Sequence, residues 1–139
     1  MADESCRFCQ IVAGVLTAAR VLEDDSCLAF LDVRPLFPGH CLLVPREHYE
    51  TLADLPVRLI GPIFADAQRL ASAVEQAMDA EGTFVAINNR VSQSVPHLHI
   101  HIVPRRRKDA LKGFFWPRGK YESDAAMRQT AEAIKAALG

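Results

Sequence analysis

SVPHLHIHIVPRR, residues 94–106, holds three of the five histidines of this chain at alternate positions: His97, His99 and His101. In an extended strand, alternate side chains point to the same face of a sheet. The three histidines should therefore share one face, while the apolar residues between them point into the core on the other: Leu98, Ile100 and Ile102. Burial of these apolar residues sets the register of the strand.

The spacing of the histidines limits how they can bind a metal ion. At about 3.3 Å per residue, His97 and His101 lie roughly 13 Å apart along the strand. A zinc ion holds each imidazole nitrogen at about 2.0–2.1 Å, so one ion cannot bind all three side chains. Two neighbouring histidines could share an ion, and the third then needs another role.

A polar sheet face that happens to contain histidines is the alternative without a function. A single histidine would usually be explained in this way. Strict alternation of three, preceded by Gln93–Ser94 and closed by Pro104, favours a function instead. Imidazole titrates near neutral pH and can act as nucleophile, acid or base, so neighbouring histidines can divide these roles.

Four other segments have the pattern of short strands: residues 19–24, 27–33, 40–45 and 83–88. The first two are separated by the turn Asp24–Asp25–Ser26, which indicates an antiparallel hairpin. RPLFPGH, residues 34–40, contains two prolines and a glycine and is therefore expected to be a loop. Together with the histidine segment, these runs predict five strands.

Three helices are expected around the strands. Ser5 can cap a short one that ends near Val12. A long helix begins near Asp54, with Gly61–Pro62 predicting a kink or a delayed start, and its apolar residues recur at helical spacing: Ile60, Ile63, Phe64, Ala67, Leu70, Ala71, Val74 and Met78. Residues from about 124 to 138 form a closing helix. The arrangement predicts an α+β fold: a five-stranded antiparallel sheet with a long helix and a short N-terminal helix.

Length and composition predict a single domain over residues 1–139. The formal net charge of −1 and the apolar content of 50% give no reason to expect nucleic acid as a partner. No run approaches the ~18 apolar residues of a membrane span, and the start MADES lacks the pattern of a secretion signal. A cytoplasmic protein with reduced cysteines and no membrane partner is expected.

The histidine segment resembles the His-x-His-x-His-x-x signature, with x apolar, of the histidine triad (HIT) family of nucleotide hydrolases and transferases. Three blocks resemble family segments in the same order: residues 5–14 (SCRFCQIVAG), 21–52 and 93–105. The resemblance implies a single HIT domain with a HIT-like fold, whose core spans about residues 5–105 and is followed by a C-terminal loop and helix at 106–139. It also implies that the chain cleaves purine nucleotides at the α-phosphate through a nucleotidyl-histidine intermediate and releases a nucleoside monophosphate.

By this resemblance, His99 is the nucleophile, and a backbone carbonyl near the PGH loop holds its second proton. His101 binds a phosphate oxygen, and His40 adds a positive or proton-donating group. Such donors offset the charge that develops on the α-phosphate.

The resemblance also implies a set of substrate contacts. Asp32 corresponds to the acidic residue that binds the ribose hydroxyls, although an aspartate there could merely cap a turn. The remaining contacts are polar residues for phosphate or ribose and apolar walls for the base: Asn88, Gln93, Ser94, Phe8, Ile11, Leu31 and Val33. Ordinary core packing explains the four apolar residues equally well. The family loop before Gln93 usually carries glycines, but here it reads Asn89-Arg90-Val91-Ser92, so Asn89 is an alternative to Asn88 and Arg90 could contact phosphate.

Cys6 and Cys9 form a CxxC pair, which is weak evidence for zinc by itself because a closed site needs four ligands. Bacterial HIT proteins that resemble this chain place structural zinc on such a pair with two histidines. The corresponding set here is Cys6, Cys9, His48 and His97, which leaves His99 and His101 for chemistry. Cys27 and Cys41 fall in predicted strands and are expected to be small core residues.

Two substrate classes remain open: dinucleoside polyphosphates such as diadenosine tetraphosphate, which the form of the motif slightly favours, and nucleoside phosphoramidates. A nucleotide-binding regulatory module with little turnover is the alternative function. HIT proteins commonly form homodimers, and the same is expected here. The aromatic and basic segment 110–122 is expected to pack on the body of the protein or on a second subunit.

Overall fold

The computed structural model describes residues 3–111 and 117–139. Residue contacts divide the chain into two compact units, residues 1–109 and 110–139. The first unit contains two α-helices, a 3₁₀ helix and five strands: α1 (Arg7–Val12), β1 (Arg20–Glu23), β2 (Cys27–Leu31), β3 (Cys41–Pro45), the 3₁₀ helix Leu52–Asp54, α2 (Val57–Ala77), β4 (Gly82–Ala86) and β5 (Ile100–Arg105). The prediction of one domain over residues 1–139 stays a prediction.

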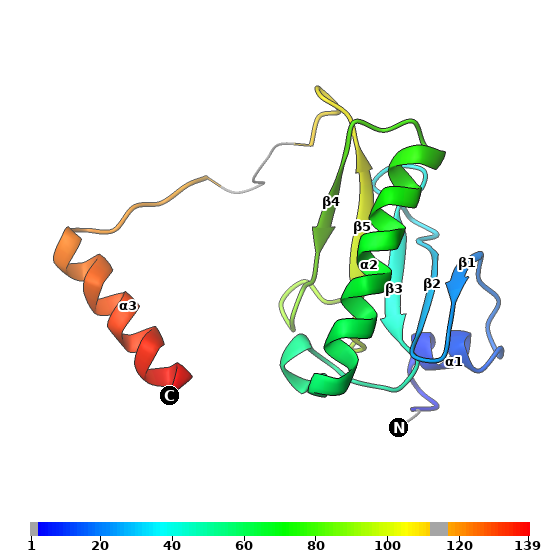
Figure 1. The fold of residues 1–139 in the computed structure, drawn as a ribbon, viewed down its shortest axis with the longest axis horizontal. Helices are drawn as coiled ribbons and strands as arrows, with labels where there is room; N and C mark the ends of the chain where they lie inside the picture. The colour runs from blue at the N-terminus through cyan, green and yellow to red at the C-terminus, as the bar shows by residue number, and fades with distance from the viewer. Residues whose placement is uncertain (1–2, 112–116) are drawn as a thin grey trace. The chain divides into compact units, whose positions relative to one another are not determined.

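The strands form one antiparallel sheet in the order β1-β2-β3-β5-β4, and α2 crosses one of its faces (Figure 1). The α+β fold with a five-stranded antiparallel sheet is confirmed. The hairpin of β1 and β2 turns at Asp24–Asp25–Ser26, as predicted.

Both faces of the central strands are buried. Under α2 lies a cluster that includes alternate residues of β2 and β3: Cys27, Ala29, Cys41 and Leu43. The residues between them pack on the opposite face with α1: Leu28, Phe30, Leu42 and Val44. The prediction that Cys27 and Cys41 are core residues is confirmed, since their exposed fractions are 1% and 2%.

The histidine segment alternates as predicted, but it is only partly strand. Leu98, Ile100 and Ile102 point into the cluster under α2. β5 begins at Ile100, so only one histidine of the three, His101, lies within it. Leu98 N–H donates to Tyr49 O at 2.6 Å, so the segment before β5 is tied to the chain after β3 rather than to a strand ladder.

Two helix starts differ from the prediction. Ser5 does not cap α1; its hydroxyl donates to Asp3 Oδ1, and Cys6 is the N-cap residue, with Sγ accepting from Cys9 N at 3.4 Å. Asp54 ends the 3₁₀ helix Leu52–Asp54, and α2 begins at Val57.

α2 differs in two further ways. Gly61–Pro62 does not delay its start, because the helix begins four residues earlier at Val57 and Pro62 lies inside its second turn. Its buried stripe is Leu59, Ile63, Asp66, Ala67, Leu70 and Val74. The stripe thus contains Leu59 and the acid Asp66, which were not predicted, whereas Ile60 and Phe64 of the predicted stripe are exposed.

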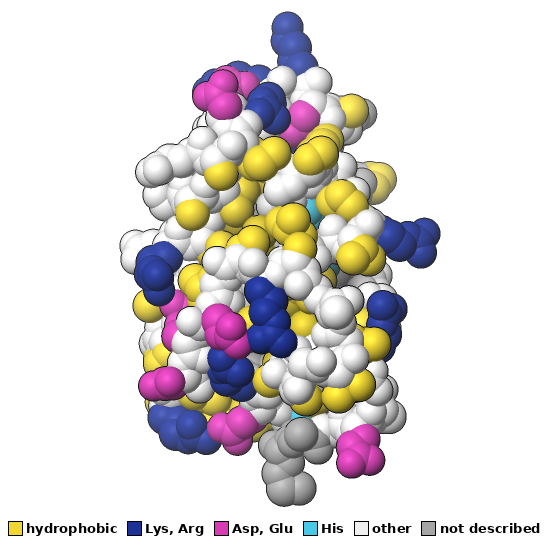
Figure 2. All heavy atoms as spheres, turned by 90° about the vertical axis from the view of Figure 1, so that its right-hand side faces the viewer, with side chains coloured by type: hydrophobic (Ala, Val, Ile, Leu, Met, Phe, Trp, Pro, Cys, Tyr) yellow, Lys and Arg dark blue, Asp and Glu magenta, His cyan; other side chains and the backbone are white. Residues whose placement is uncertain are grey.

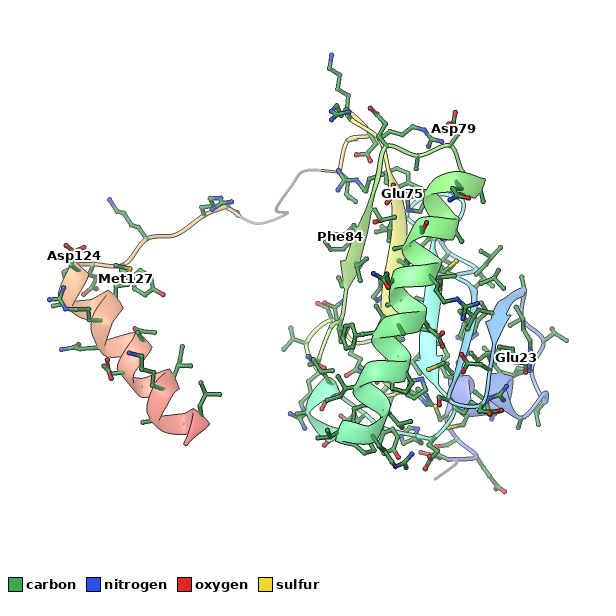
Figure 3. The ribbon with its side chains drawn as sticks, viewed as in Figure 1. Glu23, Glu75, Asp79, Phe84, Asp124 and Met127 are labelled. Carbon is green, nitrogen blue, oxygen red and sulfur yellow. The ribbon has the colours of Figure 1, made fainter. Side chains whose placement is uncertain are left out.

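The end of α2 is tied to the end of β5 and the start of β4. Glu75 Oε2 accepts from Thr83 Oγ1 at 3.3 Å, and the Arg106 guanidinium donates to the carbonyls of Met78 and Asp79. Figure 3 labels Glu75 and Asp79 at this end of the helix and Phe84 on the neighbouring β4.

Gly39, in the PGH loop, approaches this same helix end. Its φ is +98°, and a Cβ there would lie 2.6 Å from Met78 Cγ. We expect Gly39→Ala to lower the free energy of unfolding by about 1–3 kcal/mol, because a left-handed backbone and a contact with Met78 act together.

Urea unfolding checks the effect of Gly39→Ala, with Gly61→Ala as the matched control. Gly61 lies in α2, and a Cβ there meets no atom within 4 Å, so its replacement should be neutral or stabilising. Equal stability of Gly39→Ala and wild type would contradict the prediction.

The second unit contains α3 (Asp124–Leu138), at the position predicted for the closing helix. Ser123 Oγ caps it by accepting from Ala126 N at 3.0 Å. Residues 112–116 of the segment 110–122, which include its three adjacent aromatic residues, lie outside the described residues, and the predicted packing of this segment stays untested. Among the described helices, none is long and apolar enough to cross a membrane.

Figure 2 shows the face at the side of β1 and α1. Apolar side chains gather in its middle, and basic and acidic groups are interspersed around them. Such mixing is typical of a solvated protein surface rather than of a strongly charged binding face.

Candidate functional site

The four predicted metal ligands come together between α1, the loop after β3 and the segment before β5. One ligand atom from each residue lies within 4.8 Å of the others: Cys6 Sγ, Cys9 Sγ, His48 Nδ1 and His97 Nδ1. Cys9 Sγ is 3.4 Å from His48 Nδ1 and 3.5 Å from His97 Nδ1, and the two Nδ1 atoms are 3.2 Å apart. Tetrahedral zinc with ordinary bond lengths would separate S from N by about 3.5 Å and N from N by about 3.3 Å. The donor set and its spacing therefore fit zinc.

His97 is oriented for this role by the backbone. Its Nε2 lies 2.9 Å from Pro45 O, so Nε2 carries the proton and Nδ1 faces the cysteines unprotonated. Burial lowers the pKa of His97 to about 4, although the hydrogen bond to Pro45 opposes the shift. Burial also raises the pKa of the Cys6 thiol. A neutral imidazole suits a metal, and a bound cation would favour the thiolate.

His99 is buried, and among the described residues only one of its ring nitrogens has a hydrogen-bond partner. Nδ1 donates to His97 O at 2.7 Å, which leaves Nε2 unprotonated in the neutral ring. Burial lowers the pKa of the imidazole, so the neutral form prevails at neutral pH. The proton is thus held by the carbonyl of His97 and not, as expected, by one near the PGH loop.

His40 and His101 form a hydrogen-bonded pair beside His99. Leu36 N–H donates to His40 Nδ1 at 3.1 Å, so the neutral His40 carries its proton on Nε2. That nitrogen lies 3.0 Å from His101 Nδ1 and donates to it. The proton of His101 is therefore on Nε2. The ring of His101 lies 4.9 Å from that of His99, measured between centroids.

The partly buried His101 should make the free energy of unfolding depend on pH. Burial, with smaller effects of His99 and His40, lowers its pKa to about 4, whereas an unfolded histidine titrates near 6.5. Below pH 6.5 the unfolded chain binds a proton that the folded chain does not, so this stability is complete above pH 6.5 and is lost as pH falls towards 4.

His101→Gln tests this dependence. Wild type should lose on the order of 2 kcal/mol more than the variant between pH 7 and pH 4.5, as measured by urea unfolding at each pH. Parallel pH profiles of the two proteins would contradict the assignment.

Asp32 lies on the loop that carries His40. Its Oδ1 accepts from Arg34 N at 2.9 Å, so one carboxylate oxygen does cap a turn. Its Oδ2 lies 3.8 Å from His40 Nε2, and the carboxylate groups with His40 and His101. The loop is closed by Asp32 N–H, which donates to His40 O at 2.9 Å. The turn-forming and functional alternatives are therefore compatible.

The four predicted base contacts divide into two pairs. Phe8 and Ile11 are buried in the cluster under α1, whereas Leu31 is 37% and Val33 is 84% exposed. The Phe8 ring meets His97 and His99 edge to face, with centroid distances of 5.8 and 5.1 Å. Phe8 thus packs against the histidines, and only Leu31 and Val33 of the four are open to a ligand.

The loop before the histidines is held by its own polar side chains. Gln93 accepts from Arg90 N at 2.8 Å and donates to Glu50 O at 2.7 Å, and Asn89 Oδ1 accepts from Leu52 N at 2.9 Å. Asn88 and Ser94 are exposed, and neither side chain hydrogen-bonds to another described residue. Asn89 differs from Asn88 in that its Oδ1 is already bonded, and the choice between the two asparagines stays a prediction. The role of Asn88 and that of Ser94 stay predictions.

Two backbone carbonyls complete the arrangement and could not be found from the sequence. Pro45 O and His97 O determine which nitrogen of His97 and of His99 is unprotonated. Every residue has such a carbonyl, so no residue type marks the ones that are used.

Known proteins are similar to this chain over the sheet and the histidine segment. The family model described as HIT domain matches residues 13–108. A Mycobacterium tuberculosis protein described as HIT-like is 40% identical over 76% of this chain and 75% of its own length. An Arabidopsis thaliana protein named adenylylsulfatase is 34% identical over 78% of this chain and 56% of its own length. A Saccharomyces cerevisiae protein named adenosine 5'-monophosphoramidase is 29% identical over 88% of this chain and 76% of its own length.

Solved structures of HIT family proteins are similar to this chain in fold and in sequence. A HIT family structure from Bacillus subtilis has a TM-score of 0.89 at 30% identity and covers 98% of this chain and 99% of that one. A Zn-bound histidine triad protein from Mycobacterium smegmatis has a TM-score of 0.73 at 37% identity, covering 96% and 97%. Because the family model matches more than half of this chain, the chain belongs to the HIT family.

Proposed function

We propose that the protein is a nucleotide hydrolase that transfers a nucleoside monophosphate group from substrate to His99 and then to water. The observation that supports this most strongly is the 2.7 Å hydrogen bond from His99 Nδ1 to His97 O, which leaves Nε2 as a free nucleophile. Attack by Nε2 on the α-phosphorus forms the N–P bond and breaks the bond to the leaving group. Water then cleaves N–P and regenerates His99.

The His40–His101 pair supplies proton donation in this proposal. His101 Nε2–H would donate to a phosphate oxygen or to the departing group, and His40 would hold His101 in the required tautomer. Donors placed where charge develops give the main rate advantage in such chemistry. Asp32, Asn88, Gln93 and Ser94 would contact ribose and phosphate, with Leu31 and Val33 beside the base.

The substrate in this proposal is an adenylyl or guanylyl compound. The names of the yeast and Arabidopsis relatives refer to small leaving groups, an amine and sulfate, and this supports the phosphoramidate class over dinucleoside polyphosphates. We further propose structural zinc on Cys6, Cys9, His48 and His97, a cytoplasmic location and a homodimer. The Zn-bound relative supports the zinc assignment.

Three substrates test the function: adenosine 5'-phosphoramidate, adenylyl sulfate and diadenosine tetraphosphate. Chromatography should show AMP released from at least one. Release from none would overturn the hydrolase and favour the alternative, a regulatory module that binds nucleotide with little turnover. Calorimetric titration with AMP then measures whether that binding exists.

A further inference from the structure

A second cluster of possible metal ligands lies where the β1–β2 turn meets α2. One carboxylate oxygen each of Asp24 and Asp66 and the Sγ of Cys27 lie within 4.8 Å of one another. Cys27 belongs to the apolar cluster under α2, while the histidines face the side that α1 covers. The two clusters are therefore on opposite faces of the sheet. Glu23, which precedes the turn, is labelled on β1 in Figure 3.

Asp66 is a buried acid, and only one of its two carboxylate oxygens has a hydrogen-bond partner among the described residues. It is 4% exposed, and its Oδ1 accepts from Arg69 Nη1 at 3.2 Å. Its Oδ2 is buried and has no hydrogen-bond partner among the described residues. A buried carboxylate oxygen without a partner is costly, so such an atom normally meets a proton donor or a cation.

Asp24 and Cys27 are arranged to complete such a site. Asp24 Oδ1 accepts from Ser26 N at 3.0 Å and from Cys27 N at 2.9 Å, which fixes the carboxylate and leaves Oδ2 available. Each aspartate thus has one oxygen held by the protein, as in metal sites where outer groups orient the ligands. The guanidinium of Arg69 offsets part of the negative charge.

We propose that Asp24, Cys27 and Asp66 bind a divalent cation of the zinc class at a second metal site. One sulfur and two carboxylates suit a borderline soft ion better than magnesium or calcium. Three protein ligands leave a coordination position for water. A hollow of about 330 Å³ is lined in part by Glu23, which precedes Asp24, and by Arg69, which pairs with Asp66. The bound ion would link the hairpin turn to α2.

Metal content of the full chain tests the site. After chelator treatment and dialysis against Zn²⁺, wild type should hold about two equivalents per chain. Asp66→Asn and Cys27→Ser should each hold about one, and Cys9→Ser should lose the other. The matched controls are Asp25→Asn, in the same turn, and Cys41→Ser, an equally buried thiol outside the cluster. Both should retain wild-type content.

Cobalt binding and thermal unfolding test the second site in a variant that lacks the first one. In the Cys9→Ser background, Co²⁺ should give a thiolate charge-transfer band and raise the unfolding temperature, and adding Asp66→Asn should remove both effects. If the Cys9→Ser protein binds no Zn²⁺ or Co²⁺, or if Asp66→Asn leaves binding unchanged, the site does not exist. The two carboxyls would then share a proton.

Discussion

Replacement of His99 by alanine or asparagine is expected to lower AMP release at least about 10³-fold, because no other group can replace a covalent nucleophile. In the proposed mechanism, the hydrogen bonds of the three histidines favour His99 over its neighbours for this role. His97 has both nitrogens directed at Pro45 and the cysteines, and Nδ1 of His101 receives the proton of His40. Each of the three histidines has one unprotonated nitrogen, and that of His99, Nε2, takes part in none of these contacts.

Steady-state kinetics and AMP binding check this prediction together. The His99→Asn variant should bind AMP within a few-fold of wild type while turnover disappears, which separates loss of chemistry from loss of the site. His101→Gln is the comparison, and a smaller loss of about 10–100-fold is expected for a donor. Turnover by His99→Asn that matches wild type would remove His99 from its proposed role.

Removal of metal from the first cluster should have the second large effect, on stability and on catalysis at once. With free zinc about 1,000-fold above its dissociation constant, binding stabilises the folded chain by about 4 kcal/mol, and chelation or Cys9→Ser removes this. Thermal unfolding and metal analysis measure the loss. Less than about a tenth of an equivalent in wild type purified without chelator would contradict structural zinc.

The catalytic part of this effect follows from the position of His97. Its ring contacts the cysteines, while its carbonyl holds the Nδ1 proton of His99, and Phe8 packs against both rings. A change at the ring should therefore disturb the nucleophile, lowering kcat more than it raises KM. Cys41→Ser, at a buried cysteine outside both clusters, is the control and should alter neither metal content nor kinetics.

Local patterns were sufficient to predict the strands, whereas the grouping of the candidate metal ligands required the resemblance to a family. Alternation of apolar and polar residues reports which side of a strand is buried, because side chains of a strand point to opposite faces. The resemblance to HIT proteins allowed Cys6 and Cys9 to be grouped with two histidines more than 35 residues away. Neither spacing nor composition by itself could join these segments.

Helix boundaries were harder to predict, for an energetic reason. Cys6 replaces Ser5 as the cap because its sulfur accepts from Cys9 N and also faces His97. Pro62 is tolerated inside α2, where burial of the helix against the sheet outweighs one lost hydrogen bond. In both cases tertiary contacts overrode a local preference.

The sequence by itself determined the fold class, the face of the histidine segment and the residue types available for chemistry, since these depend on local periodicity and side-chain identity. Only the tertiary structure decided the tautomers of His97, His99 and His40, because backbone groups distant in sequence or unmarked by residue type hold their protons. The tertiary structure also placed Asp66 of α2 beside Asp24 and Cys27. The apolar periodicity of the helix had given no sign of this contact. Proton positions and buried charges depend on which groups lie nearby in space, and that is set by packing.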